Sequence, residues 1–393
     1  MQPLYFAKRK HPEGTPLSVK IKTRLALQLL TAATILVALA IAIPLSAQTI
    51  TTFDAPGAGM APGQGTSAFN IDPSGTIIGF TRDANNARHG FVRSTDGSFT
   101  IFNAPGAGTA AGQGTRAYAT NPSGAITGFF VGPAGPAHGY VRSNQGVITV
   151  FDAPGAGTGP FPQGTFPLSP LIINPNGAIA GYYNDSALVS HGFLRDKNGA
   201  FATFDAPGAG TGAAQGTFSY AISQGGAVTG YYYDATNASH GFLRDENGVI
   251  TTFDVPGSGT GPFQGTYGGG FTPSGTIIGN YYDAGTLSHG FLRDKNGAFT
   301  TFDAPDAGTG ANQGTFPFGI NTNGTITGWY VDGADRNHGF VRDKNGAFTE
   351  FDVPGAGAGP GQGPRVYSIA PNGTVTGFFF GPNNVVHGFV RTK

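Results

Sequence analysis

Histidine, arginine and aspartate recur together along the chain, and these three residue types could do chemistry. A histidine precedes an arginine by four residues at His89 and Arg93, His138 and Arg142, His191 and Arg195, His240 and Arg244, His289 and Arg293, His338 and Arg342, and His387 and Arg391. A carboxylate recurs at Asp54, Asp152, Asp205, Asp254, Asp303 and Asp352, with Asn103 at the remaining place. Such residues could bind a metal ion or form an acid–base pair.

A structural role for these residues is the alternative, and it is the interpretation that we favour. One hydrogen-bond network per repeat would satisfy buried polar groups and fix the register of the strands. Seven copies of one active site in a single chain would be unusual, whereas a structural contact is expected to recur in every repeat. We therefore predict no catalytic residue, no metal and no cofactor, and assign these histidines and arginines to a structural network.

The recurring residues belong to a longer repeat. The motif Phe-Asp-Ala-Pro or a close variant begins at Phe53, Phe102, Phe151, Phe204, Phe253, Phe302 and Phe351, in steps of 49 residues except for one step of 53. Gln-Gly-Thr occurs at Gln64, Gln113, Gln163, Gln215, Gln264 and Gln313, whereas Gln362 is followed by Gly363 and Pro364. We number the repeat units one to seven by these glutamines. Such regular self-similarity predicts a repeat architecture.

Each unit reads as four short strands separated by turn signals. In the sixth unit the expected strands are 315–321, 325–331, 338–342 and 347–352, and Asn-Gly pairs mark two tight hairpin turns. Four antiparallel strands in 49 residues match one blade of a β-propeller. The repeated region begins with a lone fourth strand, 50–54, and ends after a third strand, 387–391. We therefore predict an all-β, closed seven-bladed β-propeller in which the N-terminal strand completes the last blade.

The first 47 residues have a different character from the repeats. Six basic residues precede or flank an apolar run over 25–45, which ends in Leu45-Ser46-Ala47. This pattern predicts a secretory signal peptide, 1–47, with cleavage after Ala47, and a single propeller domain over 48–393. An uncleaved membrane anchor is the alternative. We expect a secreted or periplasmic protein without a membrane span in its mature form.

Charge and cysteine content exclude several classes of function. Residues 1–47 carry six basic and one acidic side chain, a net of +5, so the overall charge of zero leaves −5 for the remainder. A mildly acidic exported protein is a poor candidate for nucleic-acid binding. The chain has no cysteine, which excludes disulfides and thiol nucleophiles. We found no Gly-x-Ser-x-Gly, His-Glu-x-x-His or phosphate-loop motif.

The repeat sequence resembles a known family. The string Ile-Asn-x-x-Gly-x-Ile-x-Gly-Tyr-Tyr, followed by His-Gly-Phe-Leu-Arg, is similar to the bacterial extracellular HAF-repeat proteins, with His-Gly-Phe in place of their His-Ala-Phe. The resemblance covers residues 50–393 and implies an exported repeat protein with propeller-like repeats. It implies no catalytic residues.

A binding site is expected where the repeat varies. Three residues after the glutamine of each marker the units have Ser67, Arg116, Phe166, Phe218, Tyr267, Phe316 and Arg365. At the mouth of a propeller channel, on the face with the long loops, two guanidinium groups and four rings could hold a sugar or an anionic ligand. The alternative is that these residues pack against the loops.

These observations favour a monomeric, exported binding or interaction scaffold whose partner is a glycan or a component of the cell envelope. Two alternatives stay open at this point. One is a lyase or glycoside hydrolase on the same fold, which the fold class does not exclude. The other is a purely structural protein of the envelope.

Overall fold

The computed structural model of the chain describes residues 48–133, 135–272 and 274–393. The predicted signal peptide, with cleavage after Ala47, lies outside these residues. All 28 regular elements of the described part are β-strands, and none of its residues forms a helix long and apolar enough to span a membrane.

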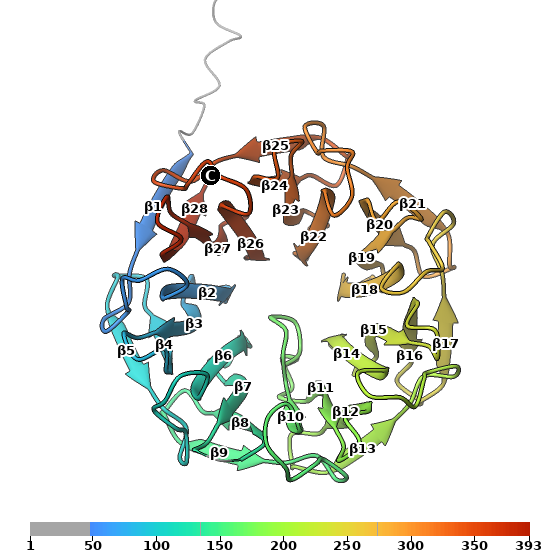
Figure 1. The fold of residues 1–393 in the computed structure, drawn as a ribbon, viewed down its shortest axis with the longest axis horizontal. Helices are drawn as coiled ribbons and strands as arrows, with labels where there is room; N and C mark the ends of the chain where they lie inside the picture. Colours follow the sequence, from blue (N-terminus) through green and yellow to red (C-terminus); the bar gives the residue numbers. More distant parts are fainter. Residues whose placement is uncertain (1–47, 134, 273) are drawn as a thin grey trace, which may run out of the picture. The chain divides into compact units, whose positions relative to one another are not determined.

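Each unit contributes strands that occupy equivalent positions around a central space (Figure 1). The first strands of the units are β2 (Gly65–Ile71), β6 (Gly114–Thr120), β10 (Gly164–Phe166), β14 (Gly216–Ile222), β18 (Gly265–Phe271), β22 (Gly314–Ile320) and β26 (Gly363–Ile369). The second strands are β3 (Ile77–Arg82), β7 (Ile126–Val131), β11 (Ile179–Asn184), β15 (Val228–Tyr233), β19 (Ile277–Tyr282), β23 (Ile326–Val331) and β27 (Val375–Phe380). First strands lie innermost.

The third and fourth strands lie progressively further out (Figure 1). The third strands are β4 (Arg88–Arg93), β8 (Ala137–Arg142), β12 (Ser190–Arg195), β16 (Ser239–Arg244), β20 (Ser288–Arg293), β24 (Asn337–Arg342) and β28 (Val386–Thr392). The fourth strands are β5 (Phe99–Phe102), β9 (Ile148–Phe151), β13 (Phe201–Phe204), β17 (Ile250–Phe253), β21 (Phe299–Phe302) and β25 (Phe348–Phe351). In the seventh unit, β1 (Thr49–Phe53) pairs antiparallel with β28.

Neighbouring units are joined by single parallel bridges. At six places the third strand of one unit pairs with the first strand of the next, namely β4–β6, β8–β10, β12–β14, β16–β18, β20–β22 and β28–β2. Each bridge is centred on the glycine that begins the first strand. Gly265, for example, has a φ of +108° and lies directly against the carbonyl of Ser239, where a side chain would not fit.

The prediction of a closed seven-bladed ring is wrong, because the sheet is open between β24 and β26. No ladder pairing joins these two strands within the described part of the chain. The N–H of Asn337 still donates to the carbonyl of Gln362 at 2.8 Å. A parallel bridge needs a second hydrogen bond, from the N–H of residue 364 to the carbonyl of Asn337, and Pro364 has no N–H. The structure therefore shows an all-β, propeller-like fold of 28 strands with an open sheet.

Pro364 also removes a second contact that the other units share. Six units have threonine at this place, and its hydroxyl accepts the N–H that follows the Phe-Asp pair, at 2.8–3.0 Å. These residues are Thr66, Thr115, Thr165, Thr217, Thr266 and Thr315. The threonine of the Gln-Gly-Thr marker therefore ties the long loop to the first strand in these six units.

The core lies between neighbouring units. Each third strand contributes one fully buried ring: Phe91, Tyr140, Phe193, Phe242, Phe291, Phe340 or Phe389. The adjoining His-Gly glycine allows the fourth strand to pack closely, since a Cβ at Gly290 would lie 2.5 Å from the ring of Phe302. Apolar and small residues on both faces of these strands are expected when sheets pack on both sides.

Candidate functional site

The recurrent histidines lie away from the innermost strands. Six of them are paired with a carboxylate at the end of a fourth strand, and His89 is paired with the amide of Asn103. In each unit the histidine Nδ1 is 2.7–3.1 Å from an oxygen of Asp54, Asn103, Asp152, Asp205, Asp254, Asp303 or Asp352. In five units the Nε2 also faces a loop carboxylate, at 3.2–3.8 Å. No group of three potential ligand residues able to hold a metal ion occurs among the described residues.

The recurrent arginines make a different contact from the histidines. Each guanidinium carbon lies 4.6–5.1 Å from the centre of a phenylalanine ring in the preceding unit: Arg93 over Phe53, Arg142 over Phe102, Arg195 over Phe151, Arg244 over Phe204, Arg293 over Phe253, Arg342 over Phe302, and Arg391 over Phe351. Histidine and arginine therefore do not form one network. The histidine ties strands within a unit, and the arginine packs between units.

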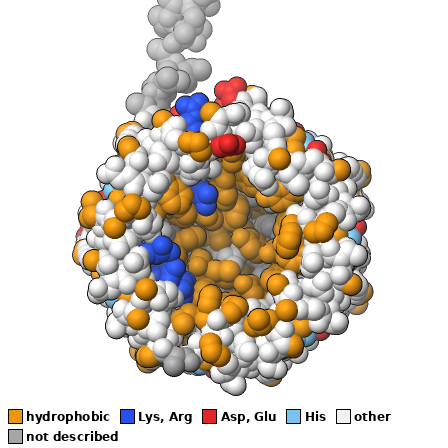
Figure 2. Space-filling view, viewed as in Figure 1, with side chains coloured by type: hydrophobic (Ala, Val, Ile, Leu, Met, Phe, Trp, Pro, Cys, Tyr) orange, Lys and Arg blue, Asp and Glu red, His pale blue; other side chains and the backbone are white. Residues whose placement is uncertain are grey.

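The centre of the molecule is hollowed and lined mainly by hydrophobic side chains, with Lys or Arg side chains at two places (Figure 2). Two positions of the repeat supply large apolar side chains near this centre. Four residues after the glycine that begins each first strand, the units have Phe69, Tyr118, Leu168, Tyr220, Gly269, Phe318 or Tyr367, and Leu168 lies just beyond the short β10. The fourth residue of the second strand is Phe80, Phe129, Tyr182, Tyr231, Asn280, Trp329 or Phe378. The fifth unit departs from this pattern at both positions, with Gly269 and Asn280.

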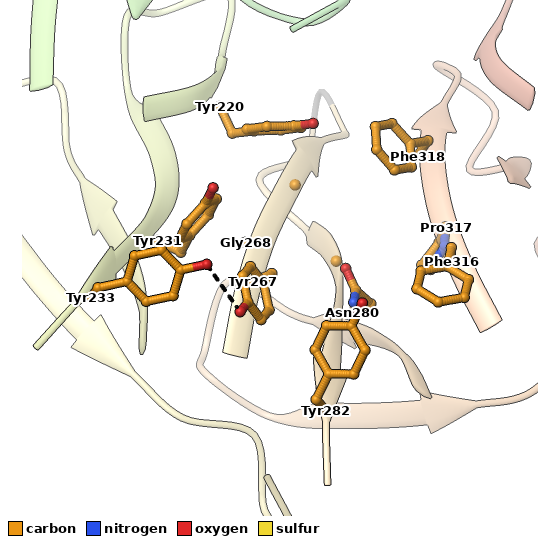
Figure 3. A pocket seen from close by; sticks show the side chains of 12 residues that line it. Tyr220, Tyr231, Tyr233, Tyr267, Gly268, Asn280, Tyr282, Phe316, Pro317 and Phe318 are labelled. Carbon is orange, nitrogen blue, oxygen red and sulfur yellow. Dashed lines mark hydrogen bonds between the residues drawn. The ribbon is translucent and has the colours of Figure 1, made fainter. Parts of the chain in front are cut away.

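A cavity of about 320 Å³ lies at these two departures. Its walls are Tyr220, Tyr231, Tyr233, Tyr267, Gly268, Gly269, Gly279, Asn280, Tyr282, Phe316, Pro317 and Phe318. Figure 3 shows Tyr231 and Tyr233 on one side, Phe316 and Phe318 on the other, and Asn280 between Tyr267 and Phe316. The volume is at the lower end of the range of small-molecule sites.

Polar atoms in the cavity are few and come from tyrosine hydroxyls and one amide. The hydroxyls of Tyr233 and Tyr267 are 3.3 Å apart, and the Tyr267 hydroxyl donates to the carbonyl of Phe263 at 3.0 Å. The amide nitrogen of Asn280 donates to the hydroxyl of Ser288 at 3.2 Å. Its Oδ1 has no hydrogen-bond partner among the described residues, so it is free to accept from a ligand.

Burial keeps the phenols of the cavity protonated. It raises the pKa of Tyr282 to about 12, with a further contribution from the nearby Tyr267. Burial also raises the pKa values of Tyr231 and Tyr267 well above the ordinary value. At neutral pH these hydroxyls are therefore neutral groups that can donate or accept hydrogen bonds.

The structure brings only part of the predicted binding set into this cavity. Tyr267 and Phe316 line it. Phe218 stacks on Tyr231 at 5.1 Å, just behind the wall. Phe166 is 3% exposed and packs on Phe129 and Tyr182.

The three polar members of the predicted set lie elsewhere. Ser67 is half-buried and pairs with Phe80 in the neighbouring strand. The guanidinium of Arg365 lies 5.2 Å from the ring of Phe380. Arg116 is buried over Phe129, at 4.6 Å.

Ten of the twelve wall residues were not predicted, among them Tyr220, Tyr231, Gly269, Asn280 and Phe318. The sequence carried a signal for two of them. Gly269 and Asn280 are each a departure from an otherwise large apolar position, in the same unit. Asn280 pairs with Tyr267 across the sheet. The variable position three residues after the glutamine is therefore opposite a second variable position, on the neighbouring strand.

Comparison with known proteins gives a likeness of fold. No family model matches the chain, and no curated protein matches it. Among solved structures, the fungal lectin of Aleuria aurantia, a six-bladed β-propeller with a fucose recognition mode, is 11% identical with a TM-score of 0.41, over 86% of this chain and 93% of that chain.

Two further solved structures are similar to this chain. TolB from Acinetobacter baumannii is 11% identical with a TM-score of 0.37, over 88% of this chain and 97% of that chain. A puromycin hydrolase mutant complexed with PGG is 13% identical with a TM-score of 0.48, over 84% of this chain and 56% of that chain. None of these likenesses tests membership of the HAF-repeat family, which stays a prediction.

Proposed function

We propose that this protein is a carbohydrate-binding scaffold and that the cavity of the fifth unit takes one sugar ring. The proposal keeps the prediction that the chain is exported and related to the HAF-repeat proteins, and that its partner is a glycan of the cell envelope or the surroundings. The observation that carries it is the loss of two large side chains, at Gly269 and Asn280, in the middle of an aromatic wall.

The chemistry of the cavity matches the two sides of a sugar ring. A pyranose presents apolar C–H faces and a rim of hydroxyls. Aromatic faces such as that of Tyr231 offer an apolar surface with negative charge density, which suits C–H groups. The free Oδ1 of Asn280 and the tyrosine hydroxyls can bond to the rim, and a few placed polar groups in an apolar cavity are what fixes a ligand's orientation.

The same walls favour binding over glycoside hydrolysis at this place. Hydrolysis of a glycosidic bond generally needs two carboxyl groups that flank the scissile bond. The residues of the cavity wall supply rings, hydroxyls and an amide. These groups can hold and orient a sugar.

The single tryptophan of the chain gives a direct assay. Trp329 stacks on Phe318 at 4.7 Å and on Phe316 at 5.7 Å, and both phenylalanines line the cavity. Titration of the purified protein with neutral mono- and oligosaccharides, including fucose, galactose, glucose and N-acetylglucosamine, is expected to change the Trp329 fluorescence saturably. A glycan array provides the wider screen.

Filling the cavity is the matched test. Asn280→Trp restores the kind of ring found at this position in the other units, so it is expected to fold normally and to lose the fluorescence response and array binding. Asn198→Trp makes the same exchange at an exposed hairpin turn and is expected to bind as wild type on the array. Wild-type binding by Asn280→Trp, or no saccharide response in the wild-type protein, would overturn the proposal.

A further inference from the structure

Three arginines that interrupt the repeat lie together at the junction of the first and second units. At the places of Arg82, Arg88 and Arg116 the other units have mainly apolar, aromatic or small polar residues. The places of Arg82 hold Val131, Asn184, Tyr233, Tyr282, Val331 and Phe380, and those of Arg88 hold Ala137, Ser190, Ser239, Ser288, Asn337 and Val386. Arg116 shares its place with Arg365 and otherwise with Ser67 and four aromatic residues.

The strand pairing brings the three side chains together. Arg82, at the end of β3, is directly opposite Arg88 at the start of β4, and opposite residues in an antiparallel pair share one face of the sheet. Arg88 forms the parallel bridge with Gly114 in β6, two residues before Arg116. Three guanidinium groups from two units therefore converge at one bridge.

No carboxylate of the described residues neutralises this cluster. The arginine that forms an ion pair in the described part is Arg336, with Asp332. Two of the cluster's guanidinium groups instead bond to carbonyls: Arg82 donates to Gly63 at 2.8 Å, and Arg116 to Gly112 at 2.7 Å. Like charges held close together without an anion repel one another.

Two guanidinium nitrogens of the cluster are buried without a partner. The Nη1 atoms of Arg88 and Arg116 are inaccessible and have no hydrogen-bond partner among the described residues. Arg116 as a whole residue is 6% exposed. An unsatisfied charged donor at such depth is costly. Recurrent arginines such as Arg391 also leave buried nitrogens unpaired, but these guanidinium groups lie over a phenylalanine ring, a contact that Arg88 lacks within the described part of the chain.

The titration behaviour is consistent with this arrangement. Burial, and then repulsion by Arg88, lower the pKa of Arg116 to about 10. Burial also lowers the pKa of Arg88, with a further contribution from Arg82. A bound anion would oppose both effects, because it favours the charged form.

Arg116 alone could be explained by packing, but the cluster could not. Its guanidinium over Phe129 takes the place of the ring that stacks there in other units, such as Phe218 on Tyr231. No such contact accounts for Arg88, whose place is filled by serine in three units.

We propose that Arg82, Arg88 and Arg116 form an oxoanion-binding site, distinct from the aromatic cavity, that takes a carboxylate, sulfate or phosphate group. Guanidinium groups bind such groups through paired, charge-assisted hydrogen bonds. The site does not depend on the carbohydrate proposal, since its residues do not overlap the walls of that cavity.

The test is an anion titration of the purified protein by calorimetry and thermal unfolding. Sodium sulfate at low millimolar concentration is compared with sodium chloride of equal ionic strength, which separates specific binding from the general effect of sulfate. Saturable sulfate binding is expected, with a rise in melting temperature of about 1–2 °C relative to chloride.

Two of the variants replace Arg88 and Arg116 by residues that other units have at these places. Arg88→Ser with Arg116→Phe is expected to weaken sulfate binding about tenfold or more, without lowering the melting temperature in chloride. Arg88→Ser alone keeps Arg116 over Phe129 and is expected to show an intermediate loss. Arg336→Gln removes one guanidinium that already has a carboxylate partner, so it is expected to bind sulfate as wild type.

Further arms of the titration separate the sources of the anion. Glucuronic acid carries a carboxylate on a sugar ring, acetate carries a carboxylate without a sugar, and phosphate is a free inorganic ion. Binding of any of these that is lost in the double variant supports the site, and preference for glucuronic acid over acetate assigns it to an acidic sugar. Equal behaviour of sulfate and chloride with no binding of any other anion, or unchanged binding in the double variant, overturns the proposal. Trp329 fluorescence monitors the aromatic cavity independently.

Discussion

The fifth and sixth units have the same length and the same markers, yet the fifth opens a cavity where the sixth is filled. The fifth has Gly269 and Asn280 where the sixth has Phe318 and Trp329. The ring of Trp329 lies 4.7 Å from that of Phe318 and 5.3 Å from that of Tyr367. No ring is available at the two places in the fifth unit, and the cavity of about 320 Å³ lies there.

The backbone of the two units is nevertheless alike. In both, the first and second strands pair antiparallel with a shift of register in the middle, near Gly268 in β18 and near Pro317 in β22. The residues common to all units therefore specify the fold, and two substitutions on top of it create the cavity. Function can vary in such a repeat without any change in the sheet.

The largest effect is expected from removing the ring of the sixth unit. Trp329→Ala should lower the free energy of unfolding by about 3–5 kcal/mol, because it leaves a cavity in a packed aromatic cluster. Asn280→Trp should change it by less than about 1 kcal/mol, since the ring enters space that is already empty. Urea unfolding followed by circular dichroism measures both. An equal loss of unfolding free energy in the two variants would contradict the interpretation that the fifth unit has room for a ring at residue 280.

The strands were predictable because each unit repeats its own turn signals. In the sixth unit the predicted ranges agree with β22 to β25 to within about one residue at most ends. Asn-Gly pairs and glycines of positive φ, such as Gly324 and Gly346, are local signals that need no tertiary context. The pairing of β1 with β28 was also predictable, because the repeated region begins with a lone fourth strand and ends after a third strand.

The open junction in the sheet and the position of the cavity could not be predicted from the sequence, because both depend on tertiary contacts. The sequence shows that the last marker has Gly-Pro in place of Gly-Thr. The effect of this proline could be predicted only by knowing that the N–H of residue 364 would donate the second hydrogen bond of a bridge between units. Choosing one variable position per unit found Tyr267 and Phe316. Asn280 was missed because the wall is built from two strands, and their register relates residue 267 to residue 280.

An effect of intermediate size is expected at the junction on the other side of the sixth unit. The fifth and sixth units are joined by a full bridge at Ser288 and Gly314, whereas Pro364 leaves the next junction with one of the two bonds. Pro364→Thr should add the bond to the carbonyl of Asn337 and a hydroxyl acceptor for the N–H of Val353. The two hydrogen bonds stabilise the folded protein, whereas loss of the proline increases the conformational entropy of the unfolded chain. We expect the free energy of unfolding to rise by about 1 kcal/mol in total.

Hydrogen exchange and urea unfolding check this expectation. The amide of residue 364 in the Pro364→Thr protein should exchange slowly, as in the ladder at the other junctions. Pro360→Thr, in the exposed part of the preceding loop, makes the same change in chain entropy without a new partner and should be slightly destabilising. A fast-exchanging residue 364, with both variants equally destabilised, would contradict the assignment of the open junction to the missing N–H.

The smallest effect is expected from an acid-sensitive loop that the sixth unit has in stronger form than the fifth. The carboxylate of Asp332 is 3.2 Å from Nε2 of His338 and also pairs with Arg336 at 2.9 Å, whereas the corresponding distance from His289 to Asp283 is 3.8 Å. Burial alone would raise the pKa of Asp332, but the N–H groups of Arg336 and Ala334 and the side chains of His338 and Arg336 outweigh it and lower the pKa to about 2.

Because the folded pKa of Asp332 is below the ordinary value of 3.8, its contribution to stability is complete above pH 3.8 and is lost as the pH falls through about 2. Asp332→Asn should therefore lower the free energy of unfolding by about 0.5 kcal/mol at pH 5 to 7, and the difference from wild type should vanish near pH 2. Arg336→Gln keeps the carboxylate and should show a smaller difference over the same range. Urea unfolding at each pH measures both variants, and a difference for Asp332→Asn that stays constant from pH 6 to pH 2 would show that the ionised carboxylate does not stabilise the sixth unit.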